Sequence, residues 1–102
     1  MQLMVIGNPD TVRGFALAGV RGEIALTPEA LERAMDIAMA DAEIGIVLVT
    51  QDVAALAPER IDALKGRGDL IPLVVEIPGP DGPHADRPSL SETIRHITGV
   101  RV

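Results

Sequence analysis

The amino-acid sequence predicts an α/β fold in which an open, four-stranded and mainly parallel sheet is flanked by helices. Nearly continuous apolar runs, rather than alternating ones, indicate strands that are buried on both faces, as in a parallel sheet. Segments with helix-start signals lie between these runs. Each intervening stretch is long enough for a crossover helix, so consecutive strands can run in the same direction.

The first strand and the first helix are predicted within residues 1–20. The run MQLMVIG places four successive apolar residues before Gly7, which indicates a buried strand. Asn8 or Asp10 is expected to cap the helix that follows, and Gly14 weakens that helix. Its predicted buried face consists of Val12, Phe15, Ala16 and Gly19.

A second strand and the best-signalled helix follow. The run GEIAL predicts a short strand. Thr27 is a typical N-cap, and Pro28 suits the first helical position of a helix that extends from Glu29 to Ala42. Its predicted buried face consists of Leu31, Ala34, Met35, Ala38 and Ala42.

The run IGIVLVT is rich in β-branched residues and predicts a central strand. Thr50 at its end is expected to cap a helical segment over residues 51–56. Pro58 restarts the helix, which turns Ile61 and Leu64 inward and ends at Gly66. The run LIPLVVEIP then predicts the fourth strand, which completes a Rossmann-like or receiver-like arrangement.

The predicted domain organisation has three parts: an α/β domain over residues 1–78, a Pro/Gly-rich connecting loop over residues 79–88, and a short C-terminal helical segment over residues 89–102. Ser89 and Glu92 have the spacing of a capping box. The apolar stripe of this helix consists of Leu90, Ile94, Ile97 and Val100. The stripe either packs on the sheet of its own chain or contacts a partner, and both readings stay open.

Composition excludes several classes of function. With 102 residues the chain forms one domain, and its net charge of −6, with Lys65 as its only lysine, disfavours nucleic acid and anionic lipid surfaces. The absence of cysteine excludes disulfides and thiolate metal sites. No apolar run approaches the roughly 20 residues of a membrane-spanning helix, and no signal peptide is recognisable. We therefore expect a cytoplasmic protein without direct membrane insertion.

Ligands of open α/β sheets usually bind beyond the carboxyl ends of the strands. There the sequence places residues 7–10, then Thr50 and Gln51, and later residues 76–78. A receiver-like phospho-acceptor site would need an aspartate where Thr50 stands and a lysine at the end of the last strand, and neither is present. An unrecognised effector in the Thr50–Gln51 crevice remains an alternative.

Other chemical motifs are weak. The glycines lack the spacing of phosphate-binding loops, and His84 and His96 have no third ligand at metal spacing. Asp10 and Glu76 could form an acid–base pair across neighbouring strand ends, although solvated turn carboxylates are the simpler reading. We therefore expect no catalytic, cofactor-binding or metal-binding residues.

Four segments carry a family resemblance: VIGNPDTVRGFALAGV, IGIVLVTQDVA, PLVVEIPGPDGP and SLSETIRHITGVRV. In this order they are similar to the characteristic segments of the F subunit of V-type and A-type ATPases or ATP synthases. The resemblance covers nearly the whole chain. The pair Asn8-Pro9 departs from it, because many members have acidic residues there, and ERIDALKGRGDL follows it only in character.

The resemblance implies a non-catalytic component of the central rotor stalk, peripheral to the membrane. It implies binding to the coiled-coil D subunit beneath the A and B subunits of the headpiece, and help in coupling ATP synthesis or hydrolysis to proton or sodium transport. It also implies a mobile C-terminal segment whose apolar stripe contacts the stalk. We take Thr50 and Gln51 as further interface candidates. A receiver-like signalling or adaptor domain and a small oligomeric enzyme remain the alternatives.

Overall fold

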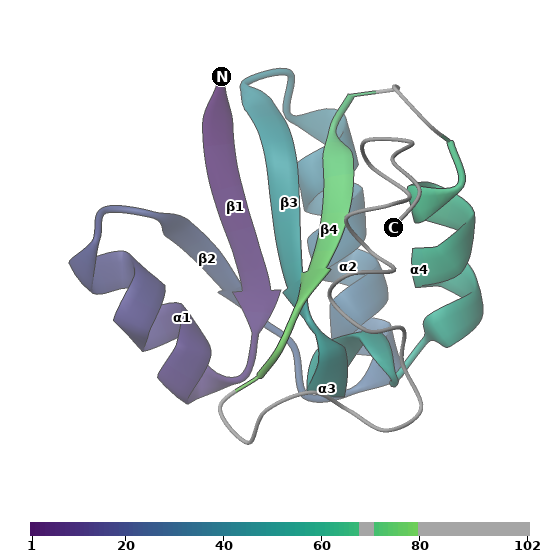
Figure 1. The fold of residues 1–102 in the computed structure, drawn as a ribbon, viewed down its shortest axis with the longest axis horizontal. Coiled ribbons are helices and arrows are strands. Elements are labelled where there is room, and N and C mark those ends of the chain that lie inside the picture. The colour runs from purple at the N-terminus through teal and green to yellow at the C-terminus, as the bar shows by residue number, and fades with distance from the viewer. Residues whose placement is uncertain (68–70, 80–102) are drawn as a thin grey trace, which may run out of the picture.

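The four strands form one sheet that is parallel throughout, with the order β2-β1-β3-β4. The computed structural model describes residues 1–67 and 71–79 (Figure 1). The elements are β1 (Gln2–Gly7), α1 (Pro9–Leu17), β2 (Arg21–Ile24), α2 (Pro28–Ala40), β3 (Ile44–Thr50), α3 (Gln51–Ala54), α4 (Pro58–Lys65) and β4 (Leu73–Ile77). The predicted α/β fold and its open parallel sheet are confirmed.

The helices lie on two sides of the sheet. Helix α1 contacts β1 and β2, whereas in Figure 1 α2 lies behind the strands, with α4 to the right of β4 and α3 near the lower ends of β3 and β4. This division follows from the strand order, because the chain steps from β1 outward to β2 in one direction and then returns from β2 past β1 to β3 and β4 in the other. Right-handed crossovers place helices on opposite faces when the direction of stepping reverses.

The apolar core lies between the sheet and the layer of α2, α3 and α4. It is aliphatic, as the composition predicts, and the only aromatic residue, Phe15, is half-buried outside it. Its largest members are Met4, Ile6, Leu31, Met35, Ile44, Val47, Val49 and Ile61. Four of the predicted inward residues of α2 are buried, and the fifth, Ala42, lies beyond the helix end and is exposed.

Two of the predicted helix caps are present. The Asn8 side chain accepts a hydrogen bond from the Thr11 N–H at 2.9 Å, and the Thr27 hydroxyl accepts one from Ala30 at 3.1 Å. Thr50 occupies the N-cap position of α3, but its side chain makes no capping hydrogen bond. Thr50 is also the last residue of β3, and its methyl group packs towards Gly7, so the strand fixes the orientation of the side chain.

Helix α1 differs from its prediction, because none of its residues is buried. Val12 and Phe15 are half-buried, whereas Ala16 is exposed and Gly19 lies in the turn after the helix with a φ of 82°. The helix lies at the β2 end of the sheet, and no other described helix packs on that face (Figure 1). Its apolar residues therefore remain partly open to solvent.

None of the helices within residues 1–67 and 71–79 is long and apolar enough to cross a membrane. The connecting loop predicted over residues 79–88 falls almost wholly outside the described residues, and the helix predicted over residues 89–102 does so entirely.

Candidate functional site

The position where an open α/β sheet usually binds a ligand lies between the carboxyl ends of β1 and β3. A side-chain hydrogen bond spans this position, from Asn8 Nδ2 to Asp52 Oδ2 at 3.1 Å. Asn8 also caps α1 through its other amide atom, so its whole side chain is engaged. This exposed hydrogen bond links the residue that follows β1 to α3, across the ends of β1 and β3.

Thr50 and Gln51, the interface candidates at this edge, have exposed fractions of 0% and 2%. Neither side chain therefore lies on the surface of the described residues. The Thr50 hydroxyl has no hydrogen-bond partner among those residues, although it is fully buried. A partner would reach these two side chains only after a rearrangement of their neighbours, and their role as contacts stays a prediction.

The end of β4 is also joined to this edge. A side chain on Gly79 would place its Cβ 2.6 Å from Asp52 Oδ1, which is far inside contact distance. A larger residue at position 79 would require the exposed Asp52 side chain to move. Asp52 therefore hydrogen-bonds Asn8 after β1 and lies close to Gly79 after β4.

The possible acid–base pair of Asp10 and Glu76 is wrong. Asp10 is exposed on α1, where its carboxylate lies 3.3 Å from the Arg13 guanidinium. Glu76 is buried on the opposite side of the sheet, in register with the buried Val49. Successive side chains of a strand point to opposite faces of the sheet, and that of Glu76 points to the face covered by α4. The carboxylate of Asp10 lies on the other side, with α1.

Glu76 instead forms a buried ion pair that sequence reasoning missed. Lys65 Nζ at the end of α4 lies 2.7 Å from Glu76 Oε2, and the two side chains are 8% and 0% exposed. The pair closes the gap between α4 and β4. Two signals could have indicated it, namely that Lys65 is the only lysine and that Glu76 interrupts an otherwise apolar strand.

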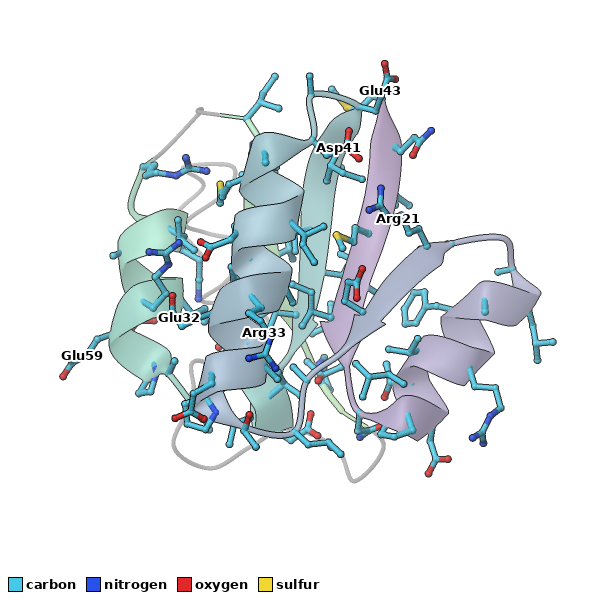
Figure 2. All side chains as sticks on the ribbon, turned by 180° about the vertical axis from the view of Figure 1, so that it is seen from behind. Arg21, Glu32, Arg33, Asp41, Glu43 and Glu59 are labelled. Carbon is cyan, nitrogen blue, oxygen red and sulfur yellow. The ribbon has the colours of Figure 1, made fainter. Side chains whose placement is uncertain are left out.

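The amino edge of the sheet carries an exposed ion pair. Arg21 of β2 lies 2.7 Å from Asp41, which caps the end of α2 (Figure 2). The backbone N–H of Glu43, followed by the Arg21 guanidinium, holds the pKa of Asp41 below its ordinary value. The pair fastens β2 to the end of α2.

The outer surface of α2 and α4 is strongly charged (Figure 2). Arg60 of α4 reaches two carboxylates of α2, Glu32 at 3.7 Å and Asp36 at 3.4 Å. Glu59 projects away from α4 into solvent in Figure 2. The acidic residues of these two helices are Glu29, Glu32, Asp36, Glu59 and Asp62, against the basic residues Arg33, Arg60 and Lys65.

Two hollows adjoin α1 on the other side of the sheet. One, of about 370 Å³, is lined by Thr11, Gly14, Phe15 and Ala18. The other, of about 460 Å³, lies at the amino edge and is lined by Met1, Gln2, Leu3, Gly19, Val20 and Arg21. The lining of the first hollow is mostly apolar, whereas that of the second also includes Gln2 and Arg21.

The remaining predicted site residues lie outside the described residues. These are the stripe of Leu90, Ile94, Ile97 and Val100, together with His84 and His96. Within the described ranges, no group of three or more His, Cys, Asp or Glu residues is placed to hold a metal ion.

Comparison with known proteins gives a consistent result along the chain. A family model described as "ATP synthase (F/14-kDa) subunit" matches residues 3–95. The F subunit of the A-type ATP synthase of Methanococcus maripaludis (strain C5 / ATCC BAA-1333) is 29% identical over 104 residues, covering 100% of this chain and 99% of the relative. That of Thermococcus kodakarensis is also 29% identical, with coverages of 100% and 98%. That of Methanothermobacter thermautotrophicus is 31% identical, with coverages of 98% and 94%.

Proposed function

Because the chain belongs to the F (14-kDa) subunit family of ATP synthases, we propose that it is a non-catalytic component of the central rotor stalk of a V/A-type rotary ATP synthase. The observation that carries the proposal is the family match over residues 3–95, together with relatives of the same length that are named as F subunits of A-type ATP synthases.

The proposed partner is the coiled-coil D subunit, held beneath the A and B subunits of the catalytic headpiece. The apolar stripe predicted in residues 89–102 supports a helical partner, because an amphipathic helix of about ten residues is marginal unless something packs against it. In this role the chain helps to couple ATP synthesis or hydrolysis to proton or sodium transport.

The same role places the protein on the cytoplasmic side of the membrane, peripheral to the bilayer and attached through the complex. The net charge of −6 favours basic protein partners over anionic lipid. No specific contact in the described residues favours an adaptor or enzymatic function over the stalk role.

The test is co-expression with the D subunit from the same organism, followed by size-exclusion chromatography and a binding titration. We expect a stable 1:1 complex. The double variant Ile94→Asp and Ile97→Asp should weaken binding at least tenfold, because it places two carboxylates on the apolar stripe. The matched control is Thr93→Asp and His96→Asp, which adds the same charges beside the stripe and should change binding less than threefold.

The full assembly provides the second readout. Addition of the wild-type protein to a complex depleted of it should restore ATP-driven ion transport, whereas the stripe variant should restore less at equal concentration. Failure of the wild-type chain to bind a well-folded D subunit would refute the proposed role. Equal weakening by the stripe variant and its control would refute the assignment of the stripe.

A further inference from the structure

One face of the sheet is apolar and has no described helix over two of its strands. A Cβ on Gly22 would lie 2.6 Å from Val12 of α1 and 3.1 Å from Val5, so Val5 points to the α1 side. Register partners in a parallel sheet share a face, and Val5 pairs with Leu48, which in turn pairs with Val75. The α1 side of β3 and β4, here named the open face, therefore consists of Ile46, Leu48, Leu73, Val75 and Ile77.

The open face has the dimensions of a seat for one helix. Its five side chains are all half-buried, whereas Val47, Val49 and Val74 of the same strands are buried on the opposite side. In Figure 1, α1 lies beside β2, whereas α2 lies behind the strands and α4 to the right of β4. Two neighbouring strands span about 10 Å, which is the diameter of an α-helix. The seven residues of β3 correspond to about 23 Å, or about 15 helical residues.

The flank of α1 forms a wall beside this face. Thr11 packs against Gly7 next to β3, whereas Val12 packs over β2, so the Thr11 side of α1 is turned towards the open face. The hollow of about 370 Å³ lies on this flank, between Thr11 and Ala18. Gly14 and Ala18 in its lining are small, which allows a neighbouring helix to approach closely.

The second hollow extends the same surface at the amino edge. Its lining includes Leu3, which is 42% exposed. Leu3 is the register partner of Ile46. The nearby Leu17 at the end of α1 is 89% exposed. Leu3 therefore adds an exposed apolar side chain next to Ile46 of the open face.

The charge distribution indicates the chemistry of the partner. The open face and the lining of the 370 Å³ hollow contain no charged residue, whereas the outer surface of α2 and α4 carries five carboxylates. A surface of the first kind fits the apolar stripe of a helix. The charged outer surface of α2 and α4 remains hydrated and is suited to face away from an apolar partner.

We propose that the open face and the Thr11 flank of α1 together seat one helix of the coiled-coil partner, laid along β3 and β4. This inference rests on the proposed function, in which the stripe of residues 89–102 engages the same partner and so does not cover the open face. The chain leaves the sheet after Ile77, at one end of the open face. In this arrangement the charged surface of α2 and α4 points away from the stalk.

The test compares two alanines on the same helical segment. Ala18 lines the hollow beside the open face, and Ala16 lies on the Val12 flank, and both are exposed. In the full-length chain, Ala18→Arg should weaken binding to the D subunit at least tenfold, whereas Ala16→Arg should change it less than threefold. Gly14→Arg is a second variant on the same flank, since an added Cβ there meets no atom within 4 Å. Thermal unfolding by circular dichroism should be unchanged for Ala18→Arg and Ala16→Arg, and the unfolding temperature of Gly14→Arg should be no lower than that of the wild type, because α1 loses a glycine.

The outcomes separate this inference from the proposed function. If the wild-type chain does not bind the D subunit, both are refuted. If the wild-type chain binds and Ala18→Arg binds equally well, only the assignment of the open face is refuted. If Ala18→Arg lowers the unfolding temperature without weakening binding, the open face is covered by residues 89–102 of its own chain. If Ala18→Arg instead dissociates a homodimer of the isolated protein, the face belongs to a second copy. Either of the last two results overturns the inference.

Discussion

The buried ion pair between Lys65 and Glu76 provides a quantitative prediction about stability. Its charged atoms are 2.7 Å apart, which corresponds to an attraction of about 6 kcal/mol at an effective dielectric constant of about 20. Desolvation of the two groups offsets most of this attraction, so the intact pair contributes little net stability. Removal of one partner is different, because it leaves a buried charge without its counter-ion, at a cost of about 3–5 kcal/mol.

The two single variants should not be equivalent. Lys65→Met leaves the Glu76 carboxylate within β4, where its side chain is 0% exposed. We therefore expect this variant to lose the full amount, about 3–5 kcal/mol of unfolding free energy. Glu76→Gln leaves an ammonium on a flexible stem at the last residue of α4, from which it can reach water. We therefore expect a smaller loss for Glu76→Gln, and the double variant should be more stable than Lys65→Met alone.

The assay is urea unfolding followed by far-UV circular dichroism, because the chain has no tryptophan or tyrosine for fluorescence. A loss of 3 kcal/mol would lower the unfolding temperature of a domain of this size by at least about 12 °C. The control is Arg13→Met, which breaks an ion pair whose side chains are 73% and 82% exposed and should cost no more than about 0.5 kcal/mol. Equal losses for Lys65→Met and Arg13→Met, or no recovery in the double variant, would refute the reasoning.

The same unfolding measurements test three smaller effects. Thr50→Val should leave stability unchanged or raise it by up to about 1 kcal/mol, because the buried hydroxyl has no partner among the described residues; a larger loss would reveal a missing hydrogen bond. Gly22→Ala should destabilise by about 1–3 kcal/mol, since its Cβ would lie 2.6 Å from Val12, whereas Gly14→Ala should stabilise α1 by about 0.5–1 kcal/mol; similar effects at both sites would contradict this contrast. Because the pKa of Asp41 is lowered on folding, its ionised form adds stability that is present above about pH 3.8 and lost as the pH falls through the folded-state pKa. The stability difference between wild type and Asp41→Asn should therefore shrink below that pH, and a difference that stays constant down to about pH 2 would contradict the cause assigned to it.

Local sequence signals predicted the elements of the fold because they depend on neighbouring residues. The apolar runs before Gly7 and Thr50 marked buried strands, and Thr27 marked the start of α2. The chemistry of the strand ends was less predictable. Thr50 was expected to cap α3, but the strand that contains it fixes its side chain towards Gly7.

The contacts that sequence reasoning missed join residues distant along the chain. The separation is 11 residues for Lys65 and Glu76, and 44 for Asn8 and Asp52. Each of them depends on which strands become neighbours and on which face each residue occupies, and neither follows from local periodicity. The exposure of α1 has the same origin, since its periodicity indicates an apolar side but not whether other elements cover it.

The central position of β1 has a consequence for synthesis of the chain on the ribosome. Its first neighbour, β2, follows shortly after it, but its other neighbour, β3, begins only at Ile44. At roughly 5–20 residues per second, one edge of the apolar strand waits about 2–7 s before its partner is made. During that interval β1, α1, β2 and α2 have been synthesised, but the other edge of β1 remains unpaired and open to association with other nascent chains until β3 emerges.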